Sequence, residues 1–199
     1  MIRLFDILFA ICALVLFGPL MLIIALVVAI ADGRPVLFRQ ARVSKGGRIF
    51  HIVKFRTMND RCDQNDVLLP DAMRMTKVGR FLRRTRFDEL PQIFNILSGS
   101  MALIGPRPLL PATILAMGND GWSRCRVRPG LTGWAQVNGN SLLSDDDKLA
   151  LDLWYSANRS LSLDLRILAQ TVMVAIQGEQ QPNQASIRRA HEGHSRGRG

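Results

Sequence analysis

The sequence predicts an α/β protein that is rich in helix (α-rich): an N-terminal membrane helix, followed by short strands and amphipathic helices. Three observations predict this architecture. Residues 7–31 carry no charged side chain and are almost wholly apolar, and a membrane helix needs about 20 such residues. Residues 49–58 alternate apolar and polar side chains as a strand does. Residues 145–158 and 161–176 each carry the apolar spacing of a helix, and the first is expected to bury a stripe of Leu149, Leu153 and Trp154.

The N-terminal apolar segment can enter a membrane in two ways. Gly18 and Pro19 fall in its middle, where a proline removes one helical hydrogen bond and bends the axis. Basic residues flank both ends, Arg3 before the segment and Arg34 after it, and such residues prefer the cytoplasmic face. A re-entrant helix that enters and leaves through one leaflet satisfies both flanks, whereas a span has to carry Arg3 across. The residues alone leave a re-entrant helix and a kinked span both open.

The chain as a whole is basic. It has 26 Lys and Arg against 16 Asp and Glu, a net charge of +10 and a pI near 10.9. Its partners are therefore expected to be anionic, and nucleic acid, acidic lipid head groups and nucleotide diphosphates all qualify. Cys12, Cys62 and Cys125 lack metal-ligand spacing, so we expect reduced thiols rather than disulfides or a zinc site.

A short hairpin is expected after the membrane segment, with its turn at residues 45–47. Lys54 and Arg56 would share one face of its second strand, where they could grip a phosphate; solvated basic residues on an edge strand are the alternative. The polar stretch 59–71 is expected to be a flexible loop. Thr76 can cap the helix that follows, whose apolar face would hold Val78, Phe81, Leu82 and Thr85.

The most informative stretch is an Asp–Glu pair that precedes a proline. Pro91 suits the first turn of a helix, which we expect over residues 90–97, so Asp88 and Glu89 would lie at its positive end. Basic residues surround the pair: Lys77, Arg80, Arg83, Arg84 and Arg86. This setting predicts an ionised Asp88, as a carboxylate nucleophile or a Mg²⁺ ligand must be. An acidic helix N-terminus with surface ion pairs is the alternative.

The second half of the chain contains a rigid turn and further helices. The prolines around Arg107 fix a non-helical turn that preorganises its guanidinium for bidentate contact with phosphate. Residues 126–139 are expected to form a structured loop and strand. The apolar helix over 161–176 is too short for a span and is expected in the core or at the membrane interface. From residue 178 the polar, basic chain is expected to be a disordered tail that touches anionic lipid.

Five runs of this sequence together resemble the bacterial sugar transferase family, the small monotopic phosphoglycosyl transferases. They are Arg3-x-x-Asp6, Lys54-Phe55-Arg56-Thr57-Met58, Asp88-Glu89-Leu90-Pro91-Gln92, Gly105-Pro106-Arg107-Pro108 and Arg128-Pro129-Gly130-Leu131-Thr132-Gly133-Trp134-Ala135-Gln136. The resemblance implies a re-entrant membrane helix over residues 1–32 and a compact cytoplasmic catalytic domain over 33–177. That domain would sit on the bacterial inner membrane, with residues 178–199 as the tail. Gly18 stands where the family usually has serine before Pro19, and Phe87 replaces a common leucine.

The resemblance also implies a reaction. It is the transfer of a sugar 1-phosphate from a UDP-sugar to polyprenol (undecaprenyl) phosphate, with Mg²⁺ and with release of UMP, as the first membrane step of envelope glycan assembly. Nucleic acid is then not a partner. Asp88 matches the family nucleophile and Glu89 its dyad partner, and both are candidate metal ligands. We expect phosphate contacts from Lys54, Arg56, Arg83 and Arg107, and sugar or nucleotide contacts from Arg128, Gln136 and Asn138.

Two other classes of protein remain as alternatives. A membrane-tethered basic module that binds nucleic acid or acidic lipid explains the charge and the anchor, but neither the Asp–Glu pair nor the Pro-Arg-Pro turn. A scaffold subunit of an envelope-glycan complex would show no turnover by itself. Release of UMP from a UDP-sugar, dependent on Mg²⁺ and lipid phosphate, discriminates an enzyme from both.

Overall fold

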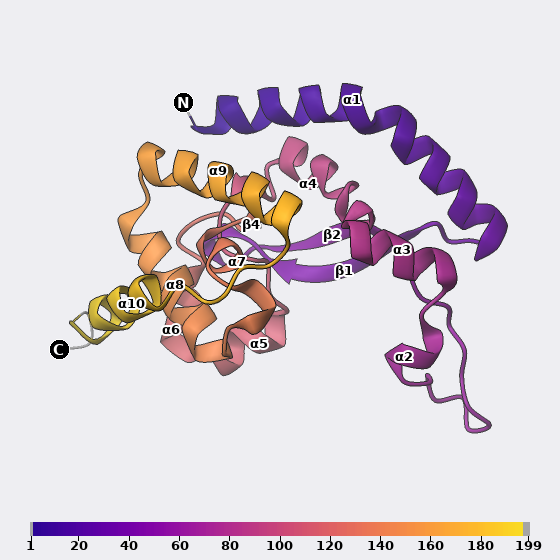
Figure 1. The fold of residues 1–199 in the computed structure, drawn as a ribbon. Coiled ribbons are helices and arrows are strands. Elements are labelled where there is room, and N and C mark those ends of the chain that lie inside the picture. The colour runs from indigo at the N-terminus through magenta and orange to yellow at the C-terminus, as the bar shows by residue number, and fades with distance from the viewer. Residues whose placement is uncertain (1, 197–199) are drawn as a thin grey trace. The chain divides into compact units, whose positions relative to one another are not determined.

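The computed structural model describes residues 2–196, and these form two compact units (Figure 1). The first unit holds the chain up to residue 40 together with residues 51–98, and the second holds residues 41–50 and the chain from residue 99 onward. The two units are joined through a hairpin of β1 (Leu37–Val43) and β2 (Ile49–Phe55), whose base lies in the first unit and whose tip lies in the second. The helix-rich α/β class with short strands is confirmed.

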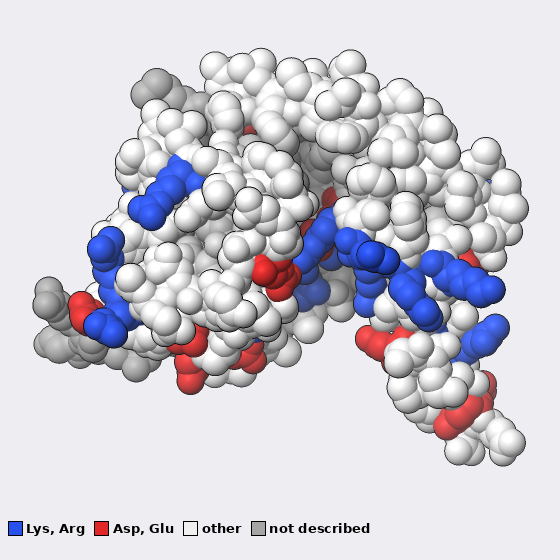
Figure 2. All heavy atoms as spheres, viewed as in Figure 1, with Lys and Arg blue, Asp and Glu red and all other residues white. Residues whose placement is uncertain are grey.

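Helix α1 (Ile2–Ala31) is the predicted apolar segment. It is long and apolar enough to cross a membrane, and only 22% of its most apolar window is buried inside the protein. The helix continues through Pro19, and Figure 1 shows a bend part-way along it. The surface that α1 presents in Figure 2 is almost wholly white, whereas Lys and Arg gather over α3 (Lys77–Thr85). The exposed apolar surface of α1 suits contact with lipid.

Both ends of α1 are fastened to the rest of the first unit. At the start, the guanidinium of Arg3 donates hydrogen bonds of 2.6 and 2.7 Å to carbonyl oxygens in the last turn of α4 (Gln92–Ser98). At the end, the carboxylate of Asp32 accepts a hydrogen bond of 2.8 Å from Thr76, the residue that caps α3. Two separate contacts thus hold the start and the end of α1 against the same compact unit.

The hairpin and α3 follow the sequence prediction closely. The turn at Lys45–Gly47 separates the strands, and Gly46 and Gly47 take the positive φ angles that glycine tolerates best. Thr76 accepts a hydrogen bond from the backbone of Gly79, as an N-cap residue does. The apolar face differs from the prediction in one residue: Phe81 is 59% exposed. Its ring lies edge-on to that of Phe87, which also lies outside the core.

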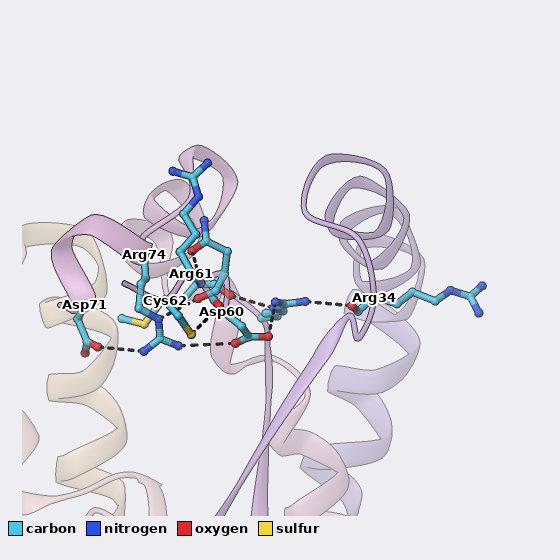
Figure 3. Close-up of polar contacts among 9 residues, drawn as sticks. Arg34, Asp60, Arg61, Cys62, Asp71 and Arg74 are labelled. Atoms are coloured by element: carbon cyan, nitrogen blue, oxygen red, sulfur yellow. Dashed lines mark hydrogen bonds and ion pairs between the residues drawn. The ribbon is translucent and has the colours of Figure 1, made fainter. Parts of the chain in front are cut away.

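Residues 58–75 form an excursion from the first unit with its own stem. Met58 and Met75 pair across its base, and the carboxylate of Asp60 lies between the guanidinium groups of Arg56 and Arg74. Figure 3 shows the ion pairs that continue from Asp60 through Arg74 to Asp71 on the short helix α2 (Asp71–Arg74). The stretch predicted as a flexible loop is therefore tied at its base by ion pairs.

The second unit is built around a parallel pair of short strands, β3 (Ala102–Ile104) and β4 (Gly130–Thr132), with Ala102 opposite Gly130 and Ile104 opposite Thr132. Its core includes the fully buried residues Leu151, Tyr155 and Ile167. The helices of this unit are α5 (Pro111–Ala116), α6 (Gly118–Arg124), α7 (Trp134–Val137), α8 (Asp145–Asn158), α9 (Leu161–Gln177) and α10 (Gln184–Arg196). The short helix α7 was not predicted, because four residues are too few to show a helical period.

Helix α8 has the predicted bounds but buries a different side. Ala150, Leu151 and Tyr155 are buried, whereas the predicted stripe of Leu149, Leu153 and Trp154 is half-buried. The reason is that α8 packs against α6, α7 and α10, so no single face carries all of its contacts. Trp154 nevertheless contributes to packing, because its ring stacks on that of Trp134 with centroids 5.7 Å apart.

The C-terminal segment differs from the disordered tail that the sequence predicted over residues 178–199. Residues 184–196 form α10, which packs on α8 and buries Ile187 and Ala190. His191 on α10 also contacts the carboxylate of Asp147 on α8 at 2.8 Å. Ile187 and Ala190 are three positions apart, so they share the face of α10 that packs on α8. Residues 197–199 of that tail lie outside the described residues.

Candidate active site

Asp88 lies on a single 3₁₀ turn, η2 (Phe87–Glu89), between α3 and α4. Arg86 precedes this turn with φ of 62°, a left-handed conformation that is uncommon for a residue other than glycine. Helix α3 ends there, and Asp88, two residues later, is only 7% exposed. The predicted helix begins at Gln92 rather than at residue 90, so Pro91 comes directly before it and two residues separate Glu89 from its start.

The electrostatic environment of Asp88 is set first by burial. Burial raises the pKa of the Asp88 carboxyl, and the positive charge of Lys54 opposes this rise. The charge of Glu89 raises the pKa further, whereas Arg83 and Arg86 lower it. The net rise differs from the sequence expectation, in which the surrounding cations dominated. Removal of this carboxyl from water outweighs the attraction of the nearby basic residues.

Lys54 and Glu89 form an ion pair beside Asp88. The ammonium nitrogen of Lys54, on β2, lies 2.5 Å from Oε1 of Glu89, and the two side chains are 20% and 14% exposed. Lys54 therefore acts on both carboxylates, as a direct partner of Glu89 and as a nearby charge for Asp88. The structure thus brings together three residues that the sequence analysis selected.

Arg83 reaches the same region from the last turn of α3. Its Nε donates a hydrogen bond of 3.0 Å to the hydroxyl of Thr57, which is buried just beyond β2. α3 lies very close to this point, because a Cβ on Gly79 would come within 2.0 Å of the carbonyl oxygen of Thr57. The sequence analysis assigned Thr57 no role, although it stands within the run of residues 54–58 that carried the resemblance.

Arg56 is engaged away from Asp88. Its guanidinium donates to the carbonyl oxygens of Met58 at 2.9 Å and Arg34 at 3.1 Å, and to the carboxylate of Asp60 at 2.7 Å. Strand β2 ends at Phe55, so Arg56 no longer follows the alternation that would have placed it beside Lys54. In the structure Arg56 ties the base of the excursion of residues 58–75 to the end of α1.

The remaining predicted site residues belong to the second unit. Arg107 is exposed in a turn whose other members, Gly105, Pro106 and Pro108, are buried. The backbone of Arg128 lies against this turn, because its carbonyl oxygen is 2.2 Å from the position of a Cβ on Gly105. Close backbone packing therefore holds the Gly105 end of this turn.

Gln136 and Asn138 lie on and just after α7. Asn138 is 2% exposed and its amide donates a hydrogen bond of 2.8 Å to the carbonyl oxygen of Trp134, so it supports the fold of the short helix. The amide nitrogen and oxygen of Gln136 are buried and have no hydrogen-bond partner among the described residues. Among the described residues, both polar atoms of Gln136 therefore stay unpaired, whereas Asn138 has a partner for its nitrogen but none for its oxygen Oδ1.

Residues 1–178 match the bacterial sugar transferase family. The chain belongs to this family. The resemblance found in the five sequence runs is thereby confirmed, and this bacterial sugar transferase is an enzyme that transfers a group. The matched region ends before α10.

Characterised and uncharacterised relatives of this bacterial sugar transferase agree with that assignment. EpsL of Bacillus subtilis, an uncharacterised sugar transferase, is 43% identical over 189 residues that cover 94% of each chain. The exopolysaccharide production protein ExoY of Rhizobium meliloti is 37% identical over 189 residues, 85% of this chain and 83% of ExoY. The UDP-N-acetylgalactosamine-undecaprenyl-phosphate N-acetylgalactosaminephosphotransferase of Aeromonas hydrophila is 41% identical over 181 residues, 87% of this chain but 43% of that protein. The transferase therefore spans most of the first two relatives and less than half of the third.

A metal ion at the acidic pair of this transferase would depend on the substrate for part of its coordination. Among residues 2–196 no group of three or more His, Cys, Asp or Glu side chains could hold a metal. Two adjacent carboxylates do suit Mg²⁺, which commonly takes one or two protein carboxylates and completes its shell with water and substrate phosphates. The raised pKa of Asp88 also fits, since a bound cation would offset the cost of its buried negative charge.

Proposed function

We propose that this bacterial sugar transferase moves a sugar 1-phosphate from a UDP-sugar to undecaprenyl phosphate and releases UMP. The single observation that carries the proposal is a buried carboxylate, Asp88, beside the Lys54–Glu89 ion pair and near Arg83. A binding module or scaffold has no need to keep an acid out of water among cations. Relatives support the substrates: a protein of Escherichia coli that is 38% identical over 179 residues is named a UDP-glucose:undecaprenyl-phosphate glucose-1-phosphate transferase.

In the first half of the proposed reaction, Asp88 is the nucleophile. A carboxylate oxygen of Asp88 attacks the phosphorus that bears the sugar, and the bond from that phosphorus to the bridging oxygen breaks. UMP leaves with the electron pair, and an aspartyl phospho-sugar remains. Both substrates are polyanions that repel each other, so a covalent intermediate lets them visit the site in turn. The positive charges of Lys54 and Arg83 stabilise negative charge on the transferring group.

In the second half, an oxygen of undecaprenyl phosphate attacks the same phosphorus. The bond from the phosphorus to Asp88 breaks, which restores the carboxylate and yields undecaprenyl diphospho-sugar. Glu89 holds the ammonium of Lys54 in place through its ion pair and so keeps that charge beside the reacting group. Arg107, presented by its rigid turn, is the further candidate for phosphate contact.

Mg²⁺ is the cofactor that we propose for this reaction. Asp88 and Glu89 would hold it, together with phosphate oxygens of the substrate. When bound, the ion supplies positive charge that neutralises the diphosphate of the donor.

The membrane arrangement that we propose is a re-entrant α1 on the cytoplasmic face of the bacterial inner membrane. Its support is the bend in α1, together with the fastening of Arg3 and Asp32, at opposite ends of the helix, to one compact unit. α9 also suits contact with lipid, because it exposes Leu161, Leu165, Val172, Met173 and Ile176. A catalytic unit placed there meets a lipid-borne acceptor at the membrane surface. We place the reaction at the first membrane step of envelope glycan assembly, with the name of the relative ExoY as support.

The test of this function is a panel of UDP-sugars offered to the purified protein with Mg²⁺ and undecaprenyl phosphate. We expect release of UMP from at least one donor, and intact-mass detection of a phospho-sugar adduct when the acceptor is left out. Asp88→Asn should abolish both signals. An adduct that persists in Asp88→Asn would refute the nucleophile, and absence of UMP release with every donor would favour a binding or scaffold protein.

A further inference from the structure

A buried ion pair in the second unit has no part in the chemistry proposed above. Arg124 ends α6 and Asp152 lies in the middle of α8. The guanidinium donates to Oδ2 of Asp152 through Nε and Nη2, both at 2.7 Å, and each side chain is 5% exposed. Two apolar residues of similar size would join these helices without removing charges from water. The presence of a charged pair therefore indicates that the guanidinium has another partner.

That partner is the backbone of the Arg107 turn. Nη2 of Arg124 also donates a short hydrogen bond to the carbonyl oxygen of Arg107. Arg124 binds one carboxylate oxygen of Asp152, Oδ2, and the other oxygen, Oδ1, accepts no hydrogen bond from the described residues. Burial raises the pKa of Asp152, and the charge of Arg124 opposes the rise, so the pair depends on both members.

The same turn is held at two further carbonyl groups. The carbonyl oxygen of Pro106 accepts a hydrogen bond of 2.9 Å from Gly130, and that of Leu109 accepts one of 3.1 Å from Val43. Both of these donors are backbone N–H groups. Of these three contacts, the contact to Arg107 itself is the one made by a side chain, that of Arg124. A change at Arg124 therefore releases the carbonyl of Arg107 while the other two contacts remain.

We propose that Arg124 and Asp152 are positioning residues that fix the direction in which Arg107 presents its guanidinium to a substrate phosphate. The inference rests on the proposed function, since it requires that Arg107 contact a phosphate of the UDP-sugar or of the lipid acceptor. Arg124 acts through the peptide group of Arg107 and does not itself touch substrate. Its buried position distinguishes it from Arg107, which is exposed.

The test compares steady-state UMP release by full-length variants in detergent. The main variant combines Arg124→Met with Asp152→Leu, which removes both charges at similar volume and should keep the thermal midpoint close to that of the parent. We expect its kcat/KM to fall by about 10- to 100-fold, the scale of loss for a misplaced binding group. Added to Arg107→Ala, the same pair of changes should cause no further loss, because the group that they position is already gone.

A second variant and a control guard against trivial outcomes. Arg124→Lys keeps a charge beside Asp152, but one ammonium group cannot bind Asp152 and the carbonyl oxygen of Arg107 as the guanidinium does. We therefore expect kcat/KM to fall although the fold is kept. The control, Arg159→Met, breaks the 3.4 Å ion pair of Arg159 with Asp164 in the same unit and should stay within about twofold of the parent.

Three results would overturn the inference. They are near-normal turnover in both Arg124 variants, an unchanged rate in Arg107→Ala, and a loss from the paired change that adds in full to that of Arg107→Ala. Failure of the proposed function is a different result, because then the parent protein itself releases no UMP from any donor.

Discussion

Asp88 has to meet two opposing demands. As the proposed nucleophile it must be ionised, yet the fold leaves it 7% exposed, which disfavours the charge. Lys54, Arg83 and Arg86 oppose the effect of burial without cancelling it, since the pKa of Asp88 remains raised. The site therefore maintains a carboxylate that is less stable than one in water. A cation that neutralises this carboxylate, or an electrophile that bonds to one of its oxygens, would therefore relieve the cost of the buried charge.

The first prediction concerns Asp88→Asn. A carboxyl whose pKa is raised by folding stabilises the protein fully below its unfolded pKa of about 3.9, and this contribution is lost as pH rises through the folded pKa. The amide carries no charge at any of these pH values. Asp88→Asn should therefore abolish transfer while raising the thermal midpoint near pH 7 in EDTA, and the gain should vanish near pH 4. A lower midpoint at pH 7 would contradict this account of Asp88.

The second prediction concerns Thr57, whose hydroxyl accepts the hydrogen bond from Arg83. Thr57→Val keeps the shape but removes the acceptor, and a hydrogen bond to a charged group contributes about 1.5–3 kcal/mol. We expect kcat/KM for UMP release to fall by about tenfold or more, and Thr57→Ser to retain most of it. Thr85→Val is a matched control on α3, because the hydroxyl of Thr85 donates to the carbonyl oxygens of Phe81 and Leu82 in its own helix. Equal losses in Thr57→Val and Thr57→Ser would argue against the contact.

At the scale of elements, α1 is the segment whose role depends most on its attachments. Thirty residues of helix extend about 45 Å, more than the roughly 30 Å hydrocarbon core of a bilayer, so length alone permits a full span. The contacts of Arg3 and Asp32 with one compact unit oppose a span, because a span would separate the two ends by the whole bilayer. The attachments therefore favour entry and exit through one leaflet.

The third prediction tests this arrangement in cells. In a variant whose native cysteines are replaced by serine, one new cysteine is placed in a tag before residue 1 and another, in a separate variant, at Arg34. An impermeant thiol reagent should label neither position in intact cells and both in inverted membrane vesicles. Labelling of the N-terminal tag from outside the cell would show that α1 spans the membrane.

The elements also show where sequence reasoning succeeds. Pro91, the Thr76 cap and the glycines of the hairpin turn located three element boundaries, because each residue has a local physical reason to stand there. The sequence analysis placed Arg56 beside Lys54, but β2 ends at Phe55, before Arg56. Where a strand ends depends on its pairing with a neighbouring strand, and the residues of one strand do not show that pairing. The buried face of α8 was misjudged for a similar reason, since several neighbouring helices decide it.

At the scale of the molecule, the candidate site could be predicted only in part. Asp88, Glu89, Lys54 and Arg83 were selected as candidates from charge and resemblance, and the structure places them in one unit. The burial of Asp88 could not be foreseen, because α3 ends just before it at a left-handed Arg86, where no glycine marks the end of the helix. The contact between Arg124 and Asp152 was equally hidden, as 28 residues separate the two in sequence.

The fourth prediction concerns α10, which the family match does not include. Ending the chain after Gly178 exposes the side of α8 that covers Ile187 and Ala190. Losing the burial of an isoleucine and an alanine should lower the thermal midpoint by about 4–8 °C. Because residues 1–178 carry the family match, turnover at low temperature should stay within about twofold. Complete loss of turnover at a temperature where the truncated chain is folded would give α10 a part in the reaction.

The attachment of α1 by both of its ends has one more consequence. A protein that inserts into a single leaflet meets the acyl chains of that leaflet alone, so lengthening the lipids of both leaflets should change its turnover little. Crowding or loosening the head groups on the side where it resides should change turnover more. The turnover of such an enzyme would depend on the lipid composition of its own leaflet more than on that of the opposite leaflet.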